Sequence, residues 1–104
     1  LGREVAETYY VEAARQFRHL GHARESLALV DELLPLIAQW RDLTEEKFEV
    51  GLATVDDMLA PQTTHLAAVL RFIELRHAEI RAEAWLLAVM GELTDDVVVR
   101  QRQQ

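Results

Sequence analysis

Apolar residues recur every three or four positions through the first half of the chain. Between residues 3 and 50, a stripe at this spacing consists of Val5, Tyr9, Ala13, Phe17, Leu20, Ala23, Leu27, Val30, Leu34 and Ile37. The average step is close to the 3.5 residues of a coiled-coil seam, which predicts a long amphipathic helix. A second stripe runs beside the first and consists of Leu29, Leu33, Leu36, Trp40 and Leu43. Two neighbouring stripes widen the apolar face, which favours packing in an assembly of several helices.

Two residues interrupt this pattern, Gly21 and Pro35. In a helix interior, Gly costs about 1 kcal/mol relative to Ala and Pro costs about 3 kcal/mol. We expect one helix that continues through both positions and bends at Pro35. The alternative is a break at Gly21, which would divide this half into two helices.

The second half of the chain predicts another long helix, from residue 55 to residue 91. Its apolar stripe consists of Leu59, Leu66, Val69, Ile73, His77, Ile80, Ala84, Leu87 and Gly91. Pro61 lies inside this helix and is expected to kink its start. Gly91 ends the pattern, and residues 94–104 are interpreted as a short C-terminal extension or tail.

Between the two helical patterns, the chain carries a helix stop followed by a helix start. Gly51 suits the position after a helix end, where a left-handed backbone favours a residue without Cβ. Thr54 suits an N-cap. Asp56 and Asp57 would then occupy the first turn, where the helix dipole favours negative charge.

The chain is therefore predicted to be all-α, a long antiparallel, coiled-coil-like helical hairpin. The hairpin spans residues 1–93, with its tip near residues 50–56, and would complete a bundle or barrel by oligomerisation because two helices bury only one seam. Folding back about this tip would place three pairs opposite each other, namely Leu27 with His77, Leu34 with Leu70, and Leu20 with Ala84.

Composition narrows the classes of function. The 104 residues suffice for one domain, and 50% of them are hydrophobic, as in folded chains. The net charge of -7 argues against binding to nucleic acid or to an anionic membrane surface. Cys is absent, which excludes disulfides and thiolate metal sites, and no apolar run is long enough for a membrane span. Because the chain begins with Leu1, we expect it to be a processed or excised piece.

Candidate chemistry is sparse. Asp56 and Asp57 are adjacent, so they point in different directions on a helix and do not make a paired-carboxylate acid/base site. No nucleophile with a neighbouring base and no glycine-rich phosphate loop is evident, so neither enzyme activity nor a cofactor is expected. Glu74 and His77 form a Glu-x-x-His pair, which resembles the ligand motif of di-iron helical bundles. The alternative metal site that follows from it consists of His22, Glu25, Glu74 and His77.

The link between the helices also carries a family resemblance. Its residues Phe48, Glu49, Gly51, Leu52, Ala53, Thr54, Asp57, Leu59 and Gln62 resemble, in order and spacing, the periplasmic hairpin tip of TolC-like outer-membrane efflux proteins. The flanking segments agree with the same family. They are Glu4-Val5 with Tyr9 or Tyr10, Ala23-x-Glu25-Ser26-Leu27, and Ala82-Glu83-Ala84-x-Leu86-Leu87-x-x-x-Gly91-x-Leu93.

The resemblance implies a transport component without enzyme activity. In this family, trimers form an α-barrel across the periplasm of the Gram-negative cell envelope, and the hairpin tips meet the periplasmic adaptor of a tripartite efflux pump. Carried onto this chain, the adaptor-contacting positions would be Gly51, Leu52, Ala53, Thr54 and Asp57. This chain has one hairpin repeat, so it would be part of such a duct, self-associating as a trimer or as a dimer. The alternatives are a small metal-binding bundle and a generic coiled-coil interaction module.

Overall fold

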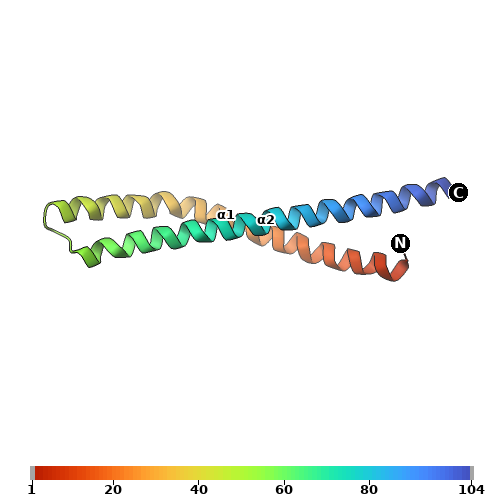
Figure 1. The fold of residues 1–104 in the computed structure, drawn as a ribbon, viewed down its shortest axis with the longest axis horizontal. Helices are drawn as coiled ribbons and strands as arrows, with labels where there is room; N and C mark the ends of the chain where they lie inside the picture. The colour runs from red at the N-terminus through yellow and green to blue at the C-terminus, as the bar shows by residue number, and fades with distance from the viewer. Residues whose placement is uncertain (1, 104) are drawn as a thin grey trace. The chain divides into compact units, whose positions relative to one another are not determined.

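The computed structural model describes residues 2–103, which form two long helices joined by a short connection (Figure 1). Helix α1 spans Arg3–Glu49 and helix α2 spans Val55–Gln103. No strand occurs within residues 2–103. The predicted all-α, coiled-coil-like helical hairpin is confirmed.

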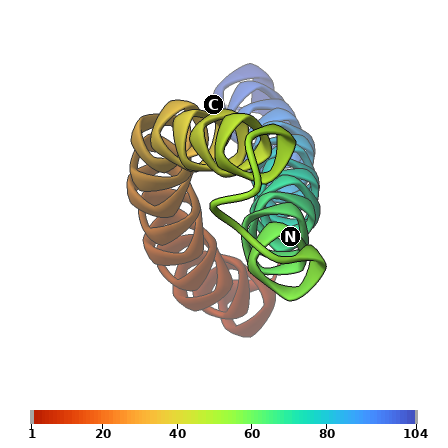
Figure 2. The ribbon, with the colours of Figure 1, turned by 90° about the vertical axis from the view of Figure 1, so that its left-hand side faces the viewer.

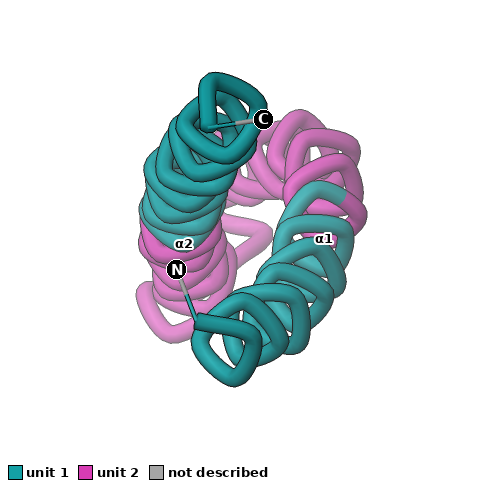
Figure 3. Tube along the Cα trace, turned by 90° about the vertical axis from the view of Figure 1, so that its right-hand side faces the viewer, with its two compact units in different colours: residues 1–24, 77–104 teal, residues 25–76 magenta. Residues whose placement is uncertain are grey.

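The chain divides into two compact units, each of which pairs a segment of α1 with a segment of α2 (Figure 3). Unit 1 consists of Leu1–Arg24 and His77–Gln104, and unit 2 consists of Glu25–Arg76. Unit 2 therefore contains the connection between the helices, residues 50–54, which faces the viewer in Figure 2 and is called the hairpin tip below.

Each helix has one regular stripe of buried and half-buried residues, which is called its seam below. On α1 the buried and half-buried positions alternate by three and four residues from Ala6 to Thr44, and on α2 they do so from Met58 to Asp96. In unit 1 the centre of the core is Leu20, Ala82 and Leu86, with Ala13 and Trp85 packed against it. In unit 2 the buried residues are Leu27, Thr44, Pro61 and Leu75. This alternation is the heptad spacing of a coiled coil.

The predicted stripe of α2 is wrong, because it lies outside this seam. Its members Leu59, Leu66, Ile73, Ile80 and Leu87 are all exposed, and the seam runs one position before each of them, from Met58 through Leu86. The predicted register is wrong for the same reason. Leu20 packs with Ala82 rather than opposite Ala84, while Leu70 and His77, the predicted partners of Leu34 and Leu27, are exposed.

The predicted stripe of α1 is mostly correct, but Val5 and Phe17 are exposed. The steps from Val5 to Phe17 are all fours. A run of fours drifts around a helix that has 3.6 residues per turn, so this part of the stripe leaves the face that the seam follows. Ala6 and Gln16 take the inward positions instead.

Neither Gly21 nor Pro35 interrupts α1, and Pro61 lies inside α2. The break at Gly21 therefore does not occur. The expected end at Gly91 is also wrong, since α2 continues through residues 94–103. Among the described glycines only Gly51 has a positive φ, so Gly91 lacks the left-handed backbone that closes a helix.

Candidate partner-contact site at the hairpin tip

Two hydrogen bonds close helix α1 at the hairpin tip. The backbone N–H of Gly51 donates to the carbonyl of Phe48 at 3.0 Å, and that of Leu52 donates to the carbonyl of Lys47 at 2.7 Å. Gly51 has a φ of 80°, the left-handed conformation that the absence of Cβ makes accessible. Together these features form a Schellman motif, which satisfies carbonyls that the helix itself leaves unpaired.

A reciprocal pair of hydrogen bonds opens helix α2. The Thr54 hydroxyl accepts from the backbone N–H of Asp57 at 3.1 Å, and the Asp57 carboxylate accepts from the backbone N–H of Thr54 at 2.8 Å. This is a capping box in which Asp takes the place of the usual Glu or Gln. The backbone hydrogen bond from Thr54, followed by that with its side chain, lowers the pKa of Asp57. The ionised form of Asp57 is therefore part of the cap that begins α2.

The motifs at both ends of the connection hold apolar side chains in solvent. Val50, Leu52 and Val55 are exposed, and Leu52 is 77% exposed. Beside them lies a hollow of about 370 Å³, called the tip hollow, which is lined by Trp40, Thr44, Lys47, Leu52, Ala53, Asp56, Asp57 and Ala60. Its lining combines apolar side chains with one cation and two carboxylates. Such a surface is suited to an apolar side chain of a partner, with polar contacts around it.

The structure places all five predicted contact residues at the tip or in the first turn of α2, but it gives them different roles. Leu52, Ala53 and Asp57 line the tip hollow. Gly51 and Thr54 shape the backbone around it.

Sequence reasoning missed the contribution of α1 to the tip hollow. Trp40, Thr44 and Lys47 recur at steps of four and three, so they share one face of the last turns of the helix. The Thr44 hydroxyl donates to the carbonyl of Trp40 at 2.8 Å, which satisfies this buried side chain. The spacing of these three residues near the end of α1 is the sequence signal that predicts their shared face.

Unit 2 also carries two uncovered apolar stripes. The α1 stripe consists of Leu29, Leu33, Leu36, Trp40 and Leu43, which are 44–60% exposed. The α2 stripe within this unit consists of Leu59, Leu66 and Ile73, which are 51–59% exposed. Each residue of the α1 stripe comes one position before a seam residue. Each residue of the α2 stripe comes one position after a seam residue. Because the two segments run antiparallel, these shifts place the stripes on opposite flanks of the unit.

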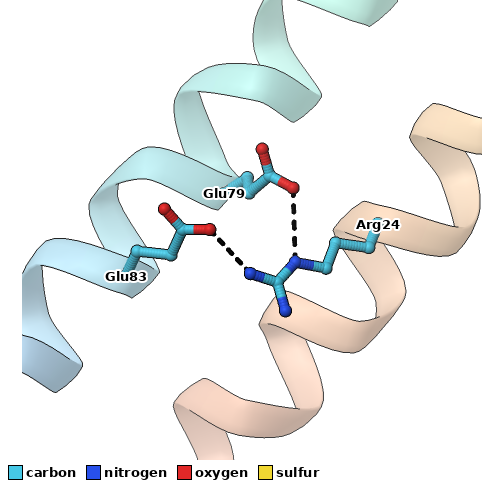
Figure 4. Close-up of polar contacts among 3 residues, drawn as sticks. All are labelled: Arg24, Glu79 and Glu83. Carbon is cyan, nitrogen blue, oxygen red and sulfur yellow. Dashed lines mark hydrogen bonds and ion pairs between the residues drawn. The ribbon is translucent and has the colours of Figure 1, made fainter.

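In unit 1, a charged cluster crosses the seam (Figure 4). The Arg24 guanidinium donates from Nη2 to Glu83 at 2.7 Å and from Nε to Glu79 at 3.4 Å. The hydrogen bond to Glu83 is the main cause that raises the pKa of Arg24. Glu79 is only 7% exposed, so this carboxylate lies buried in the seam. The cluster therefore places Arg24 of α1 across the seam from Glu79 and Glu83 of α2.

The residues of the alternative metal site do not form a ligand set. Between residues 2 and 103, no group of three or more His, Asp or Glu side chains is placed to hold a metal ion. His22, Glu25, Glu74 and His77 are all exposed. Glu74 instead accepts a hydrogen bond from Arg71 at 3.4 Å.

Neither helix, over the residues that the structure describes, contains a stretch long and apolar enough to cross a bilayer. Comparison with known proteins found no matching family model, no matching curated protein and no matching solved structure. The features of the chain that bear on function are therefore the hairpin tip, the two exposed stripes and the sequence motifs.

Proposed function

We propose that this chain is the α-helical hairpin of a TolC-like outer-membrane efflux duct in the Gram-negative periplasm. In this proposal the chain is a structural part of a transport assembly and catalyses nothing. Its tip contacts a periplasmic adaptor, and its flanks contact neighbouring hairpins. The observation that carries the proposal is the combination, within unit 2, of an exposed tip hollow with two uncovered apolar stripes on opposite flanks.

The exposed surface of the chain supports packing on more than one side. The chain exposes 7926 Å², whereas a folded monomer of this mass exposes about 6,000 Å². The excess of about 2,000 Å² exceeds twice the roughly 800 Å² that one partner contributes to a standard interface. Burial of both flanks against neighbours would remove such an excess, and stripes on opposite flanks suit a ring, in which every member has a neighbour on each side.

The sequence of the tip supports the adaptor contact. The motif from Phe48 to Gln62 resembles that of the efflux family, and its backbone-shaping residues Gly51 and Thr54 are the ones that form the Schellman motif and the capping box. Leu52 and Ala53 then present apolar surface at the tip hollow. An adaptor hairpin that inserts an apolar side chain here would meet the charged side chains of Lys47 and Asp56 in the lining of the hollow.

The adaptor contact is tested by titrating the full chain with the helical hairpin of a periplasmic adaptor and measuring the Kd by calorimetry. Leu52→Glu should weaken binding by about tenfold or more, because it places a charge at the apolar centre of the contact. Val11→Glu is the matched control, since Val11 is 72% exposed and lies in unit 1. Equal weakening by both variants, or no adaptor binding by the unaltered chain, would contradict the adaptor role.

The flank contact is tested separately by sedimentation equilibrium. We expect the full chain to self-associate and Leu36→Glu to shift it toward monomer, because Leu36 is 59% exposed at the centre of the α1 stripe. Self-association without adaptor binding would favour the alternative of a generic coiled-coil interaction module. A monomer at all accessible concentrations would remove the basis for either reading.

A further inference from the structure

A second hollow, in unit 1, has a different character from the tip hollow. Its volume is about 310 Å³, and its lining residues are Gln16, His19, Ala78, Arg81, Ala82 and Trp85. The space arises because Ala78 and Ala82 stop at Cβ beside the much larger Trp85. Trp85 is half-buried and packs against the core cluster that contains Ala82, so one wall of the hollow is anchored. We call this site the Trp85 hollow.

The cationic lining residue of the Trp85 hollow is Arg81, which is exposed. Across residues 2–103, no carboxylate pairs with Arg81. Glu12, one turn before the lining residue Gln16 on α1, is already engaged. Glu12 accepts from Arg15 at 2.7 Å and from the Gln16 amide at 3.1 Å, and these hydrogen bonds, Gln16 first, lower its pKa. Within the described residues, the Arg81 guanidinium therefore lines the hollow together with the Trp85 indole and has no carboxylate partner.

We propose that the Trp85 hollow binds a small organic carboxylate with a planar apolar body. The planar guanidinium of Arg81 suits a carboxylate, to which it can donate two parallel hydrogen bonds. The Trp85 indole and the methyl groups of Ala78 and Ala82 suit the face of a ring, and His19 supplies a further N–H donor at the lining. The volume lies at the lower end of ligand sites, which limits the body to one or two fused rings. This inference does not depend on the proposed function, because the site lies outside the unit that carries the tip.

The test uses the full chain and 2-naphthoate as the probe. Two-dimensional ¹H–¹⁵N NMR resolves the indole N–H signals of the two Trp residues, Trp40 and Trp85. We expect a saturable shift of the Trp85 indole and of the Gln16 side-chain amide, with the Trp40 indole unmoved. The neutral isostere 2-naphthamide should bind about tenfold or more weakly, since it lacks the charge-assisted hydrogen bonds. Acetate, which has the charge without the ring, should give no saturable shift in the same range.

Two variants that each remove one positive charge test whether Arg81 binds the carboxylate of 2-naphthoate. Arg81→Gln should weaken 2-naphthoate binding by about tenfold or more, the loss expected for a charge-assisted contact. Arg18→Gln removes the same charge from an exposed position of unit 1 outside the hollow and should leave the affinity unchanged. Equal binding of 2-naphthamide, equal loss in both variants, or no saturation would overturn the proposal. A Trp85 signal that moves on dilution without probe would overturn it in favour of an acidic side chain from a second copy of the chain.

Discussion

Replacement of Pro35 would measure how much a proline inside α1 lowers the free energy of unfolding. It lies inside the helix with its side chain exposed. Its nitrogen donates no hydrogen bond to the carbonyl of Asp31, and its ring crowds that turn. Pro35→Ala restores the donor and removes little packing, so it should stabilise the chain by about 3 kcal/mol. For a domain of this size, that corresponds to a rise in Tm of roughly 12–24 °C.

Pro61→Ala is the control for this prediction. Pro61 also lies inside a helix, but it is fully buried. The same backbone gain is therefore opposed by the loss of two buried methylenes, about 1.6 kcal/mol, and by the cavity that remains. Thermal unfolding followed by circular dichroism should give a clearly larger rise in Tm for Pro35→Ala than for Pro61→Ala. The scans are compared at several equal protein concentrations, because self-association also shifts Tm. An unchanged or lowered Tm for Pro35→Ala would refute the reasoning.

Three further predictions use the same unfolding measurement. Leu86 is 6% exposed, so Leu86→Ala should destabilise the chain by about 2–5 kcal/mol through loss of core packing. Leu87 is 71% exposed, so Leu87→Ala should cost little stability in the monomer. Equal losses of stability in the two variants would place the seam elsewhere. Gly51→Ala should cost about 1–2 kcal/mol, because Ala must adopt the positive φ of the Schellman motif, and an unchanged stability would show that the tip rearranges. Since its pKa is lowered in the folded state, Asp57 stabilises the fold above the ordinary carboxyl pKa of about 4. That contribution should disappear as the pH falls through the lowered value, so Asp57→Asn should flatten this part of the stability curve.

The hairpin tip could be predicted from sequence because its determinants are local. A glycine for the left-handed position, a threonine for the cap and an acidic residue three positions later act within one turn of chain. The expected start of the second helix at residue 55 agrees with the start of α2 at Val55. The tip hollow could be predicted only in part, because Trp40 and Lys47 reach it through the packing of α1 against α2 rather than through the motif.

The seam of α2 could not be chosen from apolar content, because the helix has two candidate stripes. The outer one repeats a large aliphatic residue every seven positions from Leu59 to Leu87. The true seam includes His65, Glu79 and Asp96, and so appears weaker on a count of apolar residues. The small residue Ala82, which is 4% exposed, also belongs to this seam.

The distribution of apolar residues between the seam and the exposed stripes gives the chain a reason to assemble. A hairpin that functioned alone would gain most by turning its most apolar stripe into its only seam. In unit 2 the opposite holds, because the seam accommodates Thr44 and His65 while Leu29, Leu33 and Leu36 remain exposed. Polar layers in a seam cost stability but restrict the register, which is how coiled coils specify one pairing among several. The seam therefore selects the fold of the hairpin, and the outer stripes remain available for burial against neighbours. Replacing the polar seam layers by Leu should accordingly raise the stability of the isolated chain and weaken its preference for a single assembly, which unfolding and sedimentation measurements on the same variants would separate.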